Sequence, residues 1–95
     1  MRVFVGLAMI VEHEVIDQLM CEEAGRPLAW ICRLIEGLGR EPFPLLRGMV
    51  RAGDLRLEDA EGEPLPDWQI ARLWREGTPD DPIRVHATRQ GIDKI

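Results

Sequence analysis

Apolar residues recur with helical spacing in four segments of the chain. In the first segment the apolar positions fall at i, i+4, i+5 and i+8, which is one helix face, and they are Val11, Val15, Ile16 and Leu19. Gly25 follows at a position where helices commonly end. The spacing therefore predicts a helix over about residues 10–24.

The apolar run over residues 3–11 is too continuous to fix its own secondary structure. Its β-branched and aromatic start favours a strand, but a lead-in to the first helix and a contact between two copies of the chain stay open as alternatives. Nine such residues cannot span a bilayer, and the run lacks the cleavage site of a signal peptide. We therefore expect a cytoplasmic protein without membrane contact.

Two further helices flank a break at residues 37–39. The earlier helix begins near Pro27, and its predicted buried stripe consists of Leu28, Ile31, Ile35 and Leu38. The later helix begins between Pro42 and Pro44, because prolines are tolerated where first-turn amides lack internal partners, and it ends at Gly53. Its predicted inner face consists of Phe43, Leu46, Met49 and Val50.

The second half of the chain predicts two short strands with a helix between them. Residues 55–57 alternate between apolar and polar and lead into a turn-rich loop. Asp67 is a plausible cap for a helix that ends at Glu76. Residues 83–88 alternate over six positions, which is the most regular strand pattern in the chain. Residues 89–95 are expected to form a turn or a short helix.

The order of helix, turn, helix, strand and loop resembles that of winged helix-turn-helix proteins. The run from Phe43 to Leu57 is similar to the recognition helix and first wing strand of that family, and residues 83–91 are similar to its second wing strand. The resemblance covers about residues 10–91. It implies one α+β domain over residues 1–95, with a three-helix core and a β-wing. The helix at residues 67–76, inserted between the wing strands, departs from the family pattern.

The resemblance also implies a small DNA-binding transcriptional regulator. Arg47 and Arg51, one turn apart, would enter the major groove, while Arg40 and Arg56 would contact phosphates. Guanidinium groups match both phosphate and guanine edges. The alternative is a winged-helix module that binds another protein through the acidic segment 58–81 and the tryptophans. If Arg47 and Arg51 are free, the DNA-binding hypothesis is favoured. If both are buried against acidic side chains, the protein-binding module is favoured.

Charge is distributed unevenly along the chain. From residue 26 to residue 56 there are six arginines and three acids, a net charge of +3, so the other residues sum to −8 in a chain of net charge −5. An anionic partner would bind at such a positive segment. The overall acidity argues against tight nonspecific nucleic-acid binding, and a small acidic inhibitor or DNA mimic stays a third possibility.

The side-chain chemistry argues against an enzyme. The chain has no Ser, Tyr or Asn, and Thr78 and Thr88 are its only hydroxyl side chains, which leaves few nucleophiles. The two histidines and two cysteines match no recurrent zinc-ligand spacing and form no disulfide framework. No glycine-rich phosphate loop is present. We expect no catalytic residue, no metal site and no cofactor.

The three tryptophans have different expected environments. Trp74 lies four residues after Ile70 and is expected in the core. Trp30 lies off the buried stripe of its helix, so it either packs against the first helix or lies at an interface. Trp68 would suit a contact between two copies if its helix presents it outward. Because a 95-residue domain has a thin core, we expect a homodimer.

Overall fold

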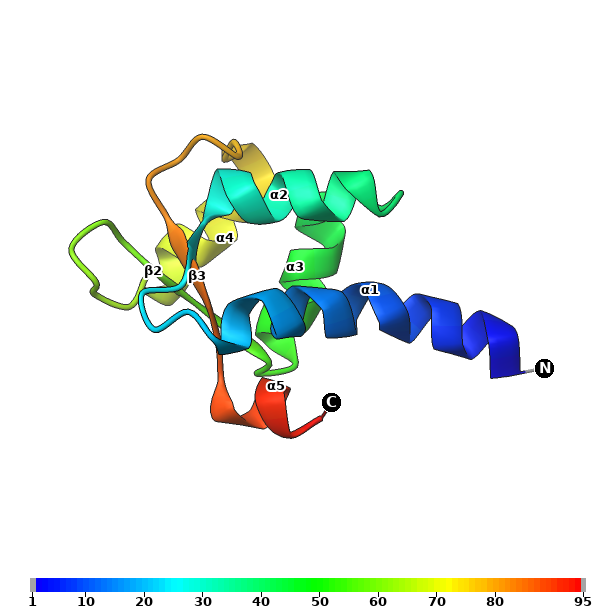
Figure 1. The fold of residues 1–95 in the computed structure, drawn as a ribbon. Helices are drawn as coiled ribbons and strands as arrows, with labels where there is room; N and C mark the ends of the chain where they lie inside the picture. The colour runs from blue at the N-terminus through cyan, green and yellow to red at the C-terminus, as the bar shows by residue number, and fades with distance from the viewer. Residues whose placement is uncertain (1, 95) are drawn as a thin grey trace.

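The chain is an α+β protein with helices packed against one face of a small sheet (Figure 1). The computed structural model describes the backbone of residues 2–94 and the side chains of residues 11–94. Within this part there are five helices and one three-stranded antiparallel sheet. In chain order the elements are α1 Arg2–Met20, β1 Arg26–Pro27, α2 Leu28–Gly37, α3 Pro42–Arg51, β2 Leu55–Glu58, α4 Asp67–Glu76, β3 Arg84–Ala87 and α5 Arg89–Asp93.

The sheet has the strand order β1-β3-β2, so the last strand of the chain lies in its middle. In the β2–β3 pair, Leu57 is opposite Val85 and Arg56 is opposite His86. Opposed residues of antiparallel strands point to the same face, and successive residues point to opposite faces. Leu57 and Val85 are buried on the core face. The other face, here called the outer face, carries Arg56, Glu58, Arg84 and His86.

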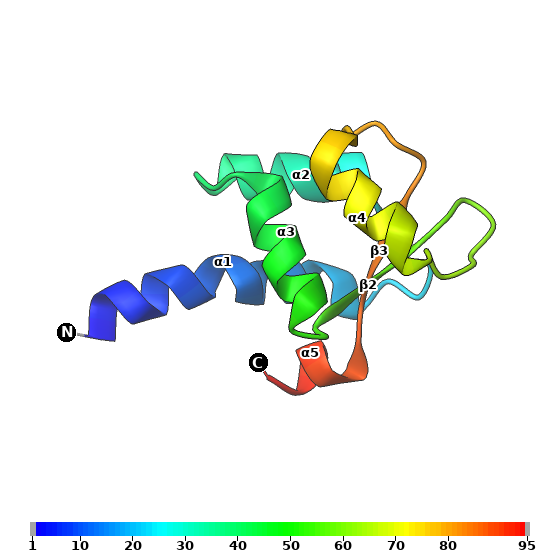
Figure 2. The same cartoon turned by 180° about the vertical axis from the view of Figure 1, so that it is seen from behind.

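The core lies between the helices and the core face of the sheet. Its buried side chains come from α1, α2, α3, α4 and both longer strands, and they include Val15, Leu28, Ile31, Ile35, Leu46, Met49, Leu73 and Val85. Seen from behind, α3 crosses in front of α1 and α2, and α4 lies beside α3 (Figure 2). This arrangement leaves one side of α3 open to solvent.

A short helix, α5, fixes the end of α3. The Thr88 hydroxyl accepts a hydrogen bond from the Gly91 amide at 3.0 Å and donates one to the Gly53 carbonyl at 2.6 Å. Gly53 has a φ of +85°, a left-handed conformation that favours glycine. Lys94 pairs with the buried Asp54 at 2.9 Å. The last turn of α3 is therefore held in place by contacts distant in sequence.

The prediction for the first helix was wrong at both ends. The helix begins at Arg2 rather than near residue 10, so a strand over the N-terminal apolar run is excluded. It also ends at Met20, because the chain then turns through bonds from the Glu22 amide to the Leu19 carbonyl and from the Gly25 amide to the Glu22 carbonyl. Gly25, at φ +70°, leads the chain into β1 and does not cap the helix.

The other helices and the two longer strands were predicted to within two residues at each end, and α5 confirms a short helix after β3. Three details differ. Asp67 is the first residue of α4 and does not cap it through its side chain. Leu38 was expected in the buried stripe of α2 but is 40% exposed, because α2 ends at Gly37. In α3, Leu45 is buried although it was not placed on the predicted inner face.

Candidate nucleic-acid interface

The open side of α3 is a stripe of four exposed residues: Pro44, Arg47, Gly48 and Arg51. They occupy positions i, i+3, i+4 and i+7 of the helix, which form one face. The buried side of the same helix consists of Leu45, Leu46 and Met49. No acidic residue occurs between Glu41 and Asp54. The exposed face of α3 therefore carries positive charge without a carboxylate of its own.

Arg47 and Arg51 are exposed, as the DNA-binding hypothesis requires. Neither forms an ion pair with any carboxylate among residues 11–94. Gly48 lies between them, and a Cβ built on it would meet nothing within 4 Å. The two guanidinium groups thus flank a stretch of bare helix backbone that another molecule can approach closely.

Arg40 lies next to this face of α3. It belongs to the turn between α2 and α3 and is exposed. Together with Pro44 and Gly48 it lines an open groove of about 530 Å³ between the turn, α3 and α1. Two carboxylates, those of Glu12 and Glu41, line the same groove. The groove is therefore mixed in charge, and its carboxylates come from α1 and from the turn before α3 rather than from α3 itself.

Arg56 has a different environment from the other three predicted arginines. It lies on the outer face of the sheet, with its side chain 54% exposed, and its Nε donates to Oε2 of Glu58 at 2.8 Å. The structure thus brings Arg40, Arg47 and Arg51 to α3 and its preceding turn, while it pairs Arg56 with an acid on the sheet.

The outer face of the sheet contains a buried histidine that sequence reasoning missed. His86 is only 8% exposed in its side chain, and its Nε2 lies 3.0 Å from Oε1 of Glu58, in an orientation that makes no regular hydrogen bond. Burial lowers the pKa of His86, Glu58 opposes this shift, and Arg56 and Arg84 add to it. The alternation of residues in the two strands would have placed these side chains on one face, had their register been known.

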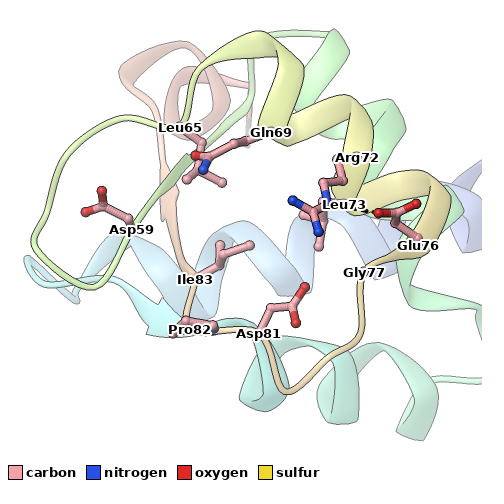
Figure 3. A pocket seen from close by; sticks show the side chains of 10 residues that line it. All are labelled: Asp59, Leu65, Gln69, Arg72, Leu73, Glu76, Gly77, Asp81, Pro82 and Ile83. Atoms are coloured by element: carbon pink, nitrogen blue, oxygen red, sulfur yellow. Dashed lines mark hydrogen bonds and ion pairs between the residues drawn. The ribbon is translucent and has the colours of Figure 1, made fainter.

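A separate pocket of about 340 Å³ lies between α4 and the loop before β3 (Figure 3). Apolar side chains of Leu65, Leu73 and Ile83 line part of it. Its carboxylates already have partners in the protein. Asp59 accepts hydrogen bonds from the backbone amides of residues 61 and 63, and Asp81 accepts one from the backbone amide of residue 78. Glu76 pairs with Arg72 at 2.9 Å. These contacts hold the carboxylates of the pocket within the protein's own loops and helix.

Features of an active site or metal centre are not prominent in the described part of the chain. Among the residues searched there, no three His, Cys, Asp or Glu side chains are grouped so that they could hold a metal ion. Burial, with a smaller contribution from Glu36, raises the pKa of the Cys32 thiol to about 11, so this thiol is protonated at neutral pH. No helix between residues 2 and 94 has the length and apolar character needed to cross a bilayer.

Comparison with known protein families, with curated proteins and with solved structures finds no match to this chain. The geometry and charge of its own residues are therefore the basis on which a function can be proposed.

Proposed function

We propose that this protein is a small winged helix-turn-helix regulator that binds double-stranded DNA through α3 and the adjacent wing. The element order supports the fold, because α2, a tight turn, α3 and then β2 follow one another as in a helix-turn-helix joined to a wing. In this proposal β2 and β3 are the wing strands and α4 is a helix inserted between them. The wing is consequently larger than a simple hairpin.

The observation that carries the proposal is the acid-free face of α3, with Arg47 and Arg51 both exposed and unpaired within residues 11–94. The major groove of B-DNA is wide enough to admit an α-helix. Gly48 permits close approach of the backbone, and the two arginines would then reach guanine edges or phosphates. Arg40, at the start of the same surface, would contact a phosphate.

The acidic remainder of the chain restricts how DNA would approach. The segment 58–81 is rich in Asp and Glu and would repel the DNA backbone, so contact is expected at α3 and at Arg56, which precedes this segment in the wing. A net charge of −5 also limits nonspecific affinity, because that affinity depends on cations that replace counterions on phosphates. The proposed regulator therefore depends on a few well-placed arginines.

We also propose that the protein acts as a homodimer, since a two-fold dimer would present two copies of α3 to successive turns of DNA. Trp68 supports self-association because it lies on α4 with 63% of its surface exposed. The same exposed tryptophan favours the second candidate function, a winged-helix module that binds another protein. The two candidates differ in their requirement for Arg47 and Arg51.

The test is fluorescence anisotropy of a labelled mixed-sequence duplex at low and at physiological salt. Replacement of Arg47 and Arg51 by alanine should weaken binding at low salt at least about tenfold and flatten its salt dependence, because two cationic contacts to phosphates are lost. The matched control replaces Arg33 and Arg89, which are exposed on α2 and α5, and removes the same charge.

Equal losses in the two double variants would show that only net charge matters and would remove α3 from the interface. Absence of any binding by the unmodified protein at low salt, where phosphate contacts are strongest, would favour the protein-binding module.

A further inference from the structure

Both oxygens of the Glu58 carboxylate lie close to a basic side chain. Oε2 accepts a hydrogen bond from Nε of Arg56 at 2.8 Å, and Oε1 lies 3.0 Å from Nε2 of His86. The Glu58 side chain is 13% exposed, whereas that of Arg56 is 54% exposed. The carboxylate is therefore the fixed partner of this pair, and the guanidinium is the partner that solvent or another molecule can reach.

The imidazole of His86 lies next to this carboxylate and is itself buried. Its ring packs against the backbone of Gly25, where a built Cβ would be 2.9 Å from two ring atoms. The charged groups that act on the imidazole are Glu58, Arg56 and Arg84. Arg84 is occupied elsewhere, because its guanidinium donates to the carbonyls of residues 24 and 25 at 2.7 and 3.0 Å. Glu58 consequently has Arg56 as its main exposed partner.

We propose that Glu58 competes with DNA for Arg56 within the same molecule. Its carboxylate occupies the Arg56 guanidinium until a phosphate of the nucleic acid replaces the carboxylate. The inference rests on the proposed function and concerns its regulation. A carboxylate and a phosphate oxygen accept the same charge-assisted hydrogen bonds from a guanidinium. DNA must displace or share Glu58 before Arg56 can contribute, so Glu58 lowers the affinity of the wing for any anion.

The test compares DNA affinity of Glu58→Gln with that of Glu61→Gln, in the anisotropy assay at several salt concentrations. Glu61 is an exposed residue that forms no ion pair with any side chain between residues 11 and 94, so its substitution removes the same charge without freeing an arginine. Glu58→Gln should tighten binding about two- to fivefold more than Glu61→Gln, the range set by exposed ion pairs. The slope of log affinity against log salt should steepen by about 0.9, for one added phosphate contact.

The effect must depend on Arg56. In an Arg56→Ala background, Glu58→Gln should gain no more than Glu61→Gln does. A gain that persists there, or equal gains from both substitutions in the unmodified protein, would reduce the effect to net charge and overturn the inference. If Glu58→Gln fails to fold by circular dichroism, Glu58→Asp, which withdraws the carboxylate by one methylene, replaces it and should tighten binding in the same direction.

The same binding assay distinguishes the role of Glu58 from DNA binding itself. Binding by the unmodified protein with no difference between the two variants overturns the role of Glu58 alone. Absence of binding by the unmodified protein and by Glu58→Gln at low salt overturns both.

Discussion

Trp74 of α4 meets Phe43 of α3 edge to face, with ring centroids 5.6 Å apart and an angle of 78° between the rings. This contact joins the helix between the two longer strands to the first turn of the helix that carries the exposed arginines. Phe43 is one turn before Arg47, so α4 packs against α3 close to its exposed arginines. An edge-to-face pair places the positive edge of one ring on the negative face of the other, and it stabilises beyond the burial of its area.

Substitution of both rings tests this link. We expect Phe43→Leu and Trp74→Leu each to lower the free energy of unfolding, with a coupling energy of about 0.5–1.5 kcal/mol between them. Urea unfolding followed by circular dichroism measures the free energy of unfolding of the unmodified protein, of each single variant and of the double variant. Trp68→Leu is the control, because an exposed tryptophan should change stability by no more than about 0.5 kcal/mol. Strict additivity would mean that the rings contribute only buried area.

The elements that could be predicted from sequence are those with a strong local signal. Residues 42–53 combine prolines at the start, helical apolar spacing and a glycine at the end, and α3 forms there. The strand β1 has no such signal. Its two residues, Arg26 and Pro27, form a strand only because Val85 and Arg84 lie opposite them, and that pairing joins segments almost sixty residues apart. The first helix was misjudged since a continuous apolar run has no period that distinguishes helix from strand.

In the candidate site, too, the residues that could be predicted are those with a strong local signal. Exposure of Arg47 and Arg51 follows from helical periodicity and was predicted, because their neighbours Leu46 and Met49 had to face the core. The pairing of Arg56 with Glu58, and the approach of His86, depend on strand register. Register is set by packing and cannot be read from one strand alone.

Gly25 offers a stability test of how tightly the outer face is packed. A Cβ at this residue would lie 2.5 Å from the Val85 carbonyl oxygen and 2.9 Å from the His86 ring, at a φ of +70°. Gly25→Ala should therefore cost about 2–5 kcal/mol, through left-handed strain together with displacement of the Val85 carbonyl and the His86 ring. Gly39→Ala, at φ +82° with nothing within 4 Å, separates the two causes and should cost only about 1–2 kcal/mol. Equal losses in thermal or urea unfolding would mean that the strand and the ring both shift without cost and that the outer face is loosely packed.

Stability should decrease on mild acidification because of His86. Burial lowers the pKa of His86 below its ordinary value of 6.5, so the unfolded chain binds this proton more readily than the folded one does. The contribution of His86 is fully present above pH 6.5 and is lost as the pH falls from there through the folded-state pKa. Urea unfolding between about pH 8 and about pH 5.5, mostly above the titration of ordinary carboxylates, should show this decrease.

The variant His86→Gln should remove that decrease over the same pH range. An unchanged pH dependence in this variant would assign the effect to other groups and would contradict the burial of His86.

Gly48 allows the DNA-binding proposal to be tested without loss of the fold. Since a Cβ there meets nothing within 4 Å, Gly48→Ala should raise the free energy of unfolding by up to about 1 kcal/mol through helix propensity. Gly48→Glu should also fold, yet it places a carboxylate between Arg47 and Arg51, and like charges at an interface cost several kcal/mol. We expect it to weaken DNA binding at least about tenfold. Ala71→Glu, an exposed position on α4, adds the same charge elsewhere and should have a much smaller effect. If the two charged variants bind DNA equally well, the exposed face of α3 is not the surface that meets DNA.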